Sequence, residues 1–338
     1  MLNLYPWQED SWQNLQGLRS HLPHALLFKG EQGIGKFDLA MLFSQSLLCS
    51  SQVEHGFACQ KCDSCRWFNQ GTHPDFRLIQ SEDLSQTEES IESNKKPSKE
   101  ISVAQIRELA DFANLSAHQG GYRVVLVHPA ESMNTNSANA LLKTLEEPSE
   151  NLLFILVTHK PQQLLPTILS RCLSFNIRTP SQKFSLAWLK QQGVSQPEHA
   201  LAQSGFSPLI ALQRSENGEV SATNRAILLA GIRQPQQLDS MALADQLQRA
   251  APVQVIHCMQ QWCYDLASYK LAGAIRYHPE QTDLIENLSK NMALPGLLRY
   301  VKELQVAKRE AFHPLNPKLL FESILLAYQQ LLIPSNKA

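Results

Sequence analysis

A glycine-rich stretch, "GEQGIGKFDL", is the first group of residues whose spacing could do chemistry. Gly30, four residues, Gly35 and then Lys36 follow the pattern of a phosphate-binding loop. Together with Gly33, the glycines permit a turn that aims backbone N–H groups at phosphates, and Lys36 adds a positive charge. Phe37 stands where the pattern places the Ser or Thr hydroxyl that holds Mg²⁺. The alternative is a β–α turn that binds nothing.

A second position for magnesium chemistry also departs from the pattern of an ATPase. A working ATPase ends a strand in acidic residues that hold the metal and orient water. The strand "RVVLVH" instead runs into His128 and Pro129, and Glu131 lies three residues beyond it. Two unsuitable magnesium positions argue against hydrolysis by this chain. We expect the loop to keep its geometry with little or no turnover, and ATP binding stays open.

Four cysteines form the second group. Cys59, Cys62 and Cys65 are each separated by two residues, and Cys49 ends the helix just upstream. Four thiolates in a tetrahedron without an open position make a structural Zn²⁺ site. Free buried cysteines and an iron–sulfur cluster are the alternatives. The remaining cysteines are expected in helices or the core: Cys172, Cys258 and Cys263.

Single polar residues give weaker indications. By its type alone, Arg171 in "ILSRC" is an ordinary surface arginine. Thr158 ends an apolar strand, where it could meet a phosphate or cap the strand end. His73 in "GTHPDF" is expected to be structural rather than catalytic.

These residues must be positioned by strands that alternate with helices. The apolar runs "HALLFKG", "RVVLVH", "NLLFILVT" and "LSFNI" read as buried strands, with helices such as "KFDLAMLFSQSLLC" and "NSANALLKTLEEP" between them. Ser102 with Gln105 three residues later predicts the start of another helix. This alternation predicts a mostly parallel sheet covered on both faces, an α/β domain. Residues 81–100 are polar and are expected to form a solvated loop.

Beyond residue 178 the strand-like runs end. Short helical patterns fill residues 179–217, and longer ones such as "PVQVIHCMQQWCYDLASYKLAG" follow in residues 218–338. The sequence therefore predicts an α/β domain over residues 1–178 and two all-helical domains after it.

Composition limits the function. The 338 residues carry a net charge of −1 and are 43% hydrophobic, with a pI near 6.8, which is unlike the basic excess of a dedicated nucleic-acid binder. This charge argues against a further hypothesis, in which the cysteine cluster binds nucleic acid. Neither a signal sequence nor an apolar run of membrane-spanning length is recognised, so a soluble, cytoplasmic protein is expected.

Taken together, the motifs resemble one family. "HALLFKGEQGIGK", the cysteine cluster followed by "GTHPDF", then "NALLKTLEEP" and "TILSRC" occur in the order seen in bacterial DNA polymerase III clamp-loader subunits, which are AAA+ proteins. The resemblance is dense from Tyr5 to Ile177 and thin beyond. It implies a AAA+ domain, a small helical lid over residues 179–217 and a helical collar that joins subunits over residues 218–338.

Within this family the departures favour one type of subunit. The motor subunit, gamma/tau, has an intact phosphate loop, an acidic pair and an arginine in the lid that senses nucleotide. This chain has Phe37, His128 and, in the lid stretch "SPLIAL", Leu209 at those positions. It therefore looks like the delta-prime type, which lacks its own ATPase activity. An active ATPase of the gamma/tau type is the alternative.

The resemblance also implies a role for Arg171. In family members the arginine of the Ser-Arg-Cys motif reaches the γ-phosphate of ATP held by a neighbouring subunit. The implied partners are gamma/tau and delta, with the sliding clamp and primed DNA reached through the complex. The implied cofactor is structural Zn²⁺.

Overall fold

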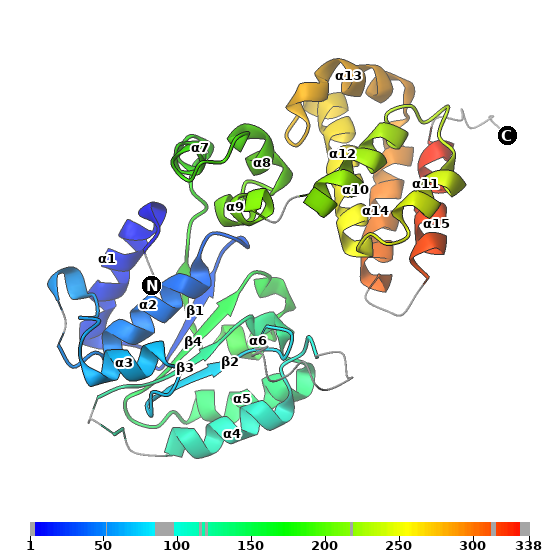
Figure 1. Cartoon of the computed structure of the whole chain (residues 1–338). Coiled ribbons are helices and arrows are strands. Elements are labelled where there is room, and N and C mark those ends of the chain that lie inside the picture. The colour runs from blue at the N-terminus through cyan, green and yellow to red at the C-terminus, as the bar shows by residue number, and fades with distance from the viewer. Residues whose placement is uncertain are drawn as a thin grey trace. The chain divides into compact units, whose positions relative to one another are not determined.

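The computed structural model describes residues 4–51, 53–84, 98–114, 117–118, 121–216, 219–311 and 316–331. The chain divides into two compact units, Met1–Phe184 and Ser185–Ala338 (Figure 1). The predicted division into three domains, with boundaries after residues 178 and 217, stays a prediction.

The first unit is built on a five-stranded sheet in the order β2-β3-β4-β1-β5, in which every pair of neighbours is parallel. The predicted parallel α/β architecture is therefore confirmed. Of the five strands, only the short strand β2 was not predicted from the sequence. The strands are β1 (Ala25–Lys29), β2 (Phe76–Ile79), β3 (Arg123–Val127), β4 (Leu152–Thr158) and β5 (Leu173–Asn176).

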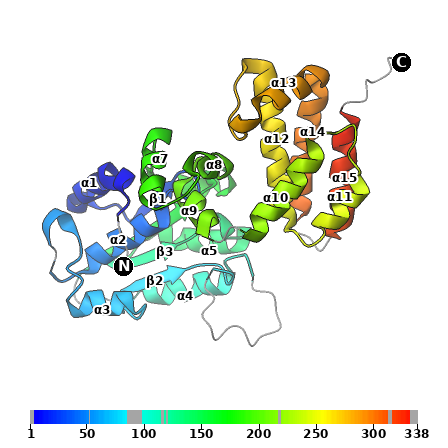
Figure 2. The same cartoon turned by 45° about the horizontal axis from the view of Figure 1, so that its top comes forward.

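Helices cover both faces of this sheet, which explains the continuous apolar runs of its central strands. Leu26 and Phe28 of β1 pack in a core with α1 (Glu9–Gly17), α2 (Lys36–Leu48) and α3 (Asp63–Asn69). Ala25 and Leu27 point to the other face and a second core with α4 (Val103–Asn114), α5 (Thr135–Glu146) and α6 (Pro166–Leu169). Helices α4 and α5 lie side by side (Figures 1 and 2).

Local capping fixes where two of these helices begin. The Oγ of Ser102 accepts from the N–H of Gln105 at 3.3 Å, and the Oε1 of Gln105 accepts from the N–H of Ser102 at 2.8 Å, which confirms the predicted cap of α4. Asn134 caps α5 through its Oδ1, which accepts from the N–H of Ser137 at 3.0 Å. The middle of the predicted polar loop, residues 85–97, lies outside the described residues.

The second unit is helical in all of its described elements, as predicted. Its largest core joins residues of α10 to α15, with Trp262, Phe321 and Tyr328 among the fully buried side chains. Proline opens several of these helices, where its missing N–H costs no hydrogen bond. The helices are α7 (Gln182–Gln191), α8 (Pro197–Gln203), α9 (Pro208–Glu216), α10 (Glu219–Ile232), α11 (Ser240–Leu247), α12 (Pro252–Ala272), α13 (Thr282–Asn291), α14 (Leu294–Glu310) and α15 (Pro317–Gln330).

Short 3₁₀ helices complete the described elements: η1 (Pro6–Gln8), η2 (Leu18–His21), η3 (Glu54–Gly56), η5 (Ala130–Ser132), η6 (Pro161–Gln163) and η7 (Pro279–Gln281). Among the described residues, no helix combines the length and the apolar character that crossing a bilayer would require.

Candidate functional site

The glycine loop follows β1, at the carboxyl edge of the sheet, where open α/β sheets bind ligands. Gly33 and Gly35 have φ angles of 76° and 79°, in the left-handed region that favours glycine. Gly35 is also crowded, because a Cβ atom there would lie 2.5 Å from the ring of Tyr5. The loop therefore has backbone turns that need glycine at Gly33 and Gly35.

Lys36 points back into its own loop. Its Nζ donates to the carbonyl oxygens of Gly30 at 2.8 Å and Glu31 at 2.5 Å, and the residue is only 2% exposed. Burial lowers the pKa of Lys36 to about 8, against the opposing pull of the carboxylates of Glu131 and Glu31. The ammonium that a phosphate would need is thus engaged by backbone acceptors.

Rings occupy the two positions where magnesium chemistry would be expected. The ring centroids of Phe37 and His128 lie 4.5 Å apart, and His159 meets His128 edge to face at 5.5 Å. Burial lowers the pKa of both histidines to about 4, so both are neutral at pH 7. Glu131 accepts from the backbone N–H of His159 at 3.0 Å. Neutral imidazoles and a phenyl ring do not offer the oxygen ligands that Mg²⁺ prefers.

The N-terminal segment packs against the same loop, a relationship that sequence reading missed. Gln8 donates through Nε2 to the carbonyl oxygens of Ile34 and Gly35, at 2.9 and 2.8 Å. Trp7 donates through Nε1 to Ile34 at 3.0 Å and stacks on Tyr5 with centroids 5.0 Å apart. These contacts tie the N-terminal segment to the loop.

Two further predicted positions have simple surroundings. The Oγ1 of Thr158 accepts from the N–H of Lys160 at 3.1 Å, which matches the strand-end cap of the two alternatives. Leu209 lies half-buried in the first turn of α9.

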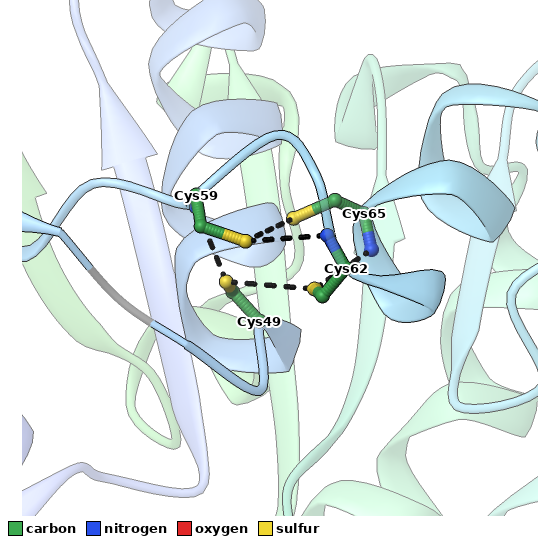
Figure 3. Close-up of side chains that lie close together, drawn as sticks. All are labelled: Cys49, Cys59, Cys62 and Cys65. Atoms are coloured by element: carbon green, nitrogen blue, oxygen red, sulfur yellow. Dashed lines mark hydrogen bonds between the residues drawn. The ribbon is translucent and has the colours of Figure 1, made fainter.

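The four predicted cysteines come together in one cluster (Figure 3). Their sulfur atoms all lie within 4.8 Å of one another. Cys49 and Cys62 are 3.8 Å apart, and Cys59 and Cys65 are 3.9 Å apart, sulfur to sulfur. A tetrahedral zinc ion with Zn–S bonds of about 2.3 Å requires sulfur atoms about 3.8 Å apart. The cluster can bind a metal ion, and its donor set suits zinc.

Backbone N–H groups point at these sulfurs and favour thiolates. The N–H of Cys65 lies 3.4 Å from the Sγ of Cys62, and the N–H of Cys59 lies 3.2 Å from the Sγ of Cys49. Although burial acts in the opposite direction, the N–H groups of Cys65 and Ser50 lower the pKa of Cys62 to about 6. Burial raises the pKa of Cys49 and Cys65. The thiolate is the form that binds metal.

His73 ties this cluster to the sheet. Its Nδ1 accepts from the N–H of Asp75 at 3.0 Å, so the proton lies on Nε2, which meets the Oγ of Ser64 at 2.8 Å. The Oγ of Ser64 donates in turn to the carbonyl oxygen of Leu48, next to Cys49, at 2.5 Å. His73 therefore has a full set of structural partners.

Arg171 lies between α6 and β5 and is one-third exposed in its side chain. Its Nη2 pairs with the Oε1 of Glu146 at 2.5 Å, and its Nη1 donates to the carbonyl oxygen of Thr167 at 2.9 Å. Sequence reading missed Glu146, although "TLEEP" and "SRC" were both recognised. The predicted catalytic role of Arg171 stays a prediction.

The parallel sheet separates Arg171 from its own glycine loop. Arg171 precedes β5, whose Leu173 is in register with Leu26 of β1, whereas Gly30 follows the other end of β1. Four residues of strand at about 3.3 Å each put Gly30 about 13 Å further along the sheet. The guanidinium and the loop therefore belong to opposite edges, the amino and the carboxyl edge.

Comparisons with known proteins identify the family of this chain. A family model described as DNA polymerase III, delta subunit, matches residues 7–181, and one described as DNA polymerase III, delta subunit, C terminal, matches residues 222–330. The chain is 37% identical to a DNA polymerase III subunit delta′ of Pseudomonas aeruginosa over 277 residues, which cover 80% of this chain and 79% of the relative.

Two further relatives show how the similarity is distributed. A delta′ subunit of Yersinia pestis is 29% identical over 97% of this chain and 96% of its own length. The tau subunit of Escherichia coli is 37% identical, but over only 46% of this chain and 22% of its own length.

The parallel α/β domain with its glycine loop and the helical regions after it define a AAA+-like protein, as predicted. The chain belongs to the delta-prime family of DNA polymerase III clamp-loader subunits. This confirms that the chain is a delta-prime subunit, as predicted. Such a subunit works in a complex with other DNA polymerase III subunits.

Proposed function

We propose that this delta-prime subunit donates Arg171 as an arginine finger to ATP bound by a neighbouring gamma/tau subunit. The observation that carries the proposal is the placement of Arg171 at the amino edge of the sheet, opposite its own glycine loop. An exposed guanidinium that cannot serve its own loop is suited to serve a partner's site.

The physical basis is the charge that moves during phosphoryl transfer. A fixed guanidinium stabilises this charge without reorganising in the transition state. In well-studied systems an arginine finger is worth about 10³–10⁵ in rate. The active site is then divided, with ATP and Mg²⁺ on the partner and one cation on this chain.

The chain itself turns over no ATP in this scheme. Phe37 and His128 supply an apolar contact where a metal ligand and an acidic residue would be needed, and Lys36 is held by its own loop. Purified alone, the chain should show no ATP hydrolysis above that of a Lys36→Ala variant. Turnover that Lys36→Ala abolishes would instead indicate an active ATPase.

The cysteine cluster holds structural Zn²⁺ in this proposal. Cys49, Cys59, Cys62 and Cys65 use all four positions of a tetrahedron, which leaves none for a substrate. Zinc here keeps the segment between α2 and α3 folded, and we assign it no contact with DNA.

The helical regions supply the assembly surfaces in this proposal. Residues 179–217 form the lid, and residues 218–338 form a collar that packs with gamma/tau and delta subunits. ATP binding by the partners opens the sliding clamp and closes it around primed DNA. Cytoplasmic location follows from this role.

Reconstituted clamp loader carrying Arg171→Ala tests the central claim. We expect ATP hydrolysis at the adjacent site to fall by about 10³-fold or more. The clamp- and DNA-stimulated ATPase activity of the loader should then fall by the part that this site contributes, and clamp loading should slow. Arg178→Ala, which removes an exposed arginine beyond β5, is the matched control. ATPase activity equal to that of the unchanged loader would contradict the proposal.

A further inference from the structure

The pair formed by Glu146 and Arg171 joins two elements that the sequence separates by 25 positions. Glu146 is the last residue of α5, and Arg171 follows α6. The Oε1 of Glu146 lies 2.5 Å from the Nη2 of Arg171, a short, charge-assisted contact. The side chains are 49% and 33% exposed, so the pair lies at the surface of the first unit.

From this contact we propose that Glu146 is a positioning residue for Arg171, which orients the guanidinium before a neighbouring subunit arrives. The inference rests on the proposed function, since it concerns how the finger is held. Glu146 does not touch ATP in this proposal and acts only through Arg171.

The reason is the flexibility of an arginine side chain. A free arginine loses much rotamer entropy when it is fixed, and that loss lowers the rate at the site it serves. Glu146 fixes Nη2, while the carbonyl oxygen of Thr167 at 2.9 Å and the Oγ of Ser170 at 3.5 Å receive Nη1. Three acceptors on two elements restrict the guanidinium to one orientation.

Positioning leaves donors for the phosphate. Arginine has five N–H donors, and the contacts with Glu146, Thr167 and Ser170 use three of them. Two N–H donors therefore remain for γ-phosphate oxygens while Glu146 stays bound. The guanidinium can bridge the carboxylate on its own chain and the phosphate on the partner.

The end of α5 reinforces this contact. A helix carries partial negative charge at its C-terminus, and Glu146 adds a full charge there. Both attract the guanidinium to the same place. Because the pair is exposed, its removal should change the orientation of Arg171 without unfolding the domain.

The test uses reconstituted loader with Glu146→Ala, Glu146→Gln and the matched control Glu147→Ala. Glu147 is the next residue, is exposed, and forms no ion pair with any residue that the structure describes. Clamp- and DNA-stimulated ATPase is measured as kcat and KM for ATP, after gel filtration has confirmed assembly of each loader.

We expect Glu146→Ala to lower the rate at the site that Arg171 serves by about three- to fivefold, which corresponds to the energy of an exposed ion pair. The kcat of the whole loader should therefore fall, but by less than it does in Arg171→Ala. KM should stay within about twofold, because the finger acts in the transition state. Glu146→Gln keeps an acceptor and should restore most of the activity, and Glu147→Ala should match the unchanged loader.

Non-additivity separates positioning from a general structural effect. On an Arg171→Ala background, Glu146→Ala should cause no further loss. A kcat that is unchanged or raised in Glu146→Ala, or a loss that persists without Arg171, would overturn the inference. If Arg171→Ala itself has no effect, the proposed function fails. If Arg171→Ala lowers the activity but Glu146→Ala does not, only the positioning role fails.

Discussion

The ring of Phe37 lies 4.5 Å from the imidazole of His128, centroid to centroid, so that two magnesium positions of an ATPase have become one contact between side chains. Phe37 lies in the first turn of α2 and His128 follows β3, which places both at the carboxyl edge of the sheet. Burial of the His128 ring favours its neutral form, so protonation of His128 should lower the stability of the fold.

Stability of the first unit should therefore depend on pH through His128. Its pKa is about 4 when folded, against an ordinary value of 6.5, because burial disfavours the charged ring. As pH falls through 6.5, the unfolded chain takes up the proton first, so stability is lost between about pH 6.5 and pH 4. Between pH 7.5 and 5 the expected loss from this group is about 2 kcal/mol.

Urea unfolding of the whole chain at both pH values measures this effect. His128→Phe keeps a ring against Phe37 but cannot titrate, so its loss of stability should be smaller by about 2 kcal/mol. His21→Gln changes an exposed histidine and should follow the unchanged protein. Parallel losses in His128→Phe and the unchanged protein would contradict the assignment.

Zinc content gives a direct test of the cysteine cluster. We expect one zinc ion per chain by mass spectrometry, and its loss in Cys62→Ser, because three sulfurs no longer close the tetrahedron. Cys258→Ala removes a buried cysteine of the second unit and should leave the zinc content unchanged.

Loss of zinc should also destabilise the first unit. The segment between α2 and α3 packs on α1, since Phe57 stacks on Trp12 with centroids 4.5 Å apart and the Nε1 of Trp12 donates to the carbonyl oxygen of His55. We expect Cys62→Ser to lower the free energy of unfolding by about 2 kcal/mol or more. A metal-free chain of full stability would leave the cysteines without a structural role.

Much of the fold could be predicted because its strands are long and apolar. The runs around Leu27, Val125 and Ile155 are buried on both faces of the sheet, and this produces a strong signal in the sequence. Strand β2, which lies at one edge of the sheet, was missed; it has four residues, of which Phe76 is buried and Arg77 exposed.

The candidate site was less predictable wherever it depends on side-chain contacts between distant elements. Spacing indicated the four cysteines, because three of them lie within seven residues of one another. By contrast, the pairing of Arg171 with Glu146 and the contact of Gln8 with Gly35 depend on how separate elements pack. No local pattern in the sequence encodes those contacts.

A buried carboxylate in the second unit offers a test of the helical region. Asp265 is fully buried and accepts from the backbone N–H groups of Arg276, Tyr277 and His278 and from the Nδ1 of His278 at 2.8 Å. Asp265→Ala leaves these donors without an acceptor and should cost about 3 kcal/mol in unfolding free energy. Asp283→Ala, at an exposed position, should change it by less than about 0.5 kcal/mol.

A comparison of two glycines tests whether the N-terminal segment is packed on the glycine loop. Gly35 and Gly193 share a φ of 79°, but a Cβ atom at Gly35 would lie 2.5 Å from the Tyr5 ring, whereas at Gly193 nothing lies within 4 Å. Gly193→Ala should therefore cost only the backbone strain, about 1 kcal/mol. Gly35→Ala should cost about 1–3 kcal/mol more, because the ring must move.

Thermal and urea unfolding of both variants measure this difference. Tyr5→Ala in combination with Gly35→Ala should recover the part of the loss that the clash causes, so that the double variant is more stable than the sum of the single changes implies. Equal losses in Gly35→Ala and Gly193→Ala would show that Tyr5 does not lie against the loop.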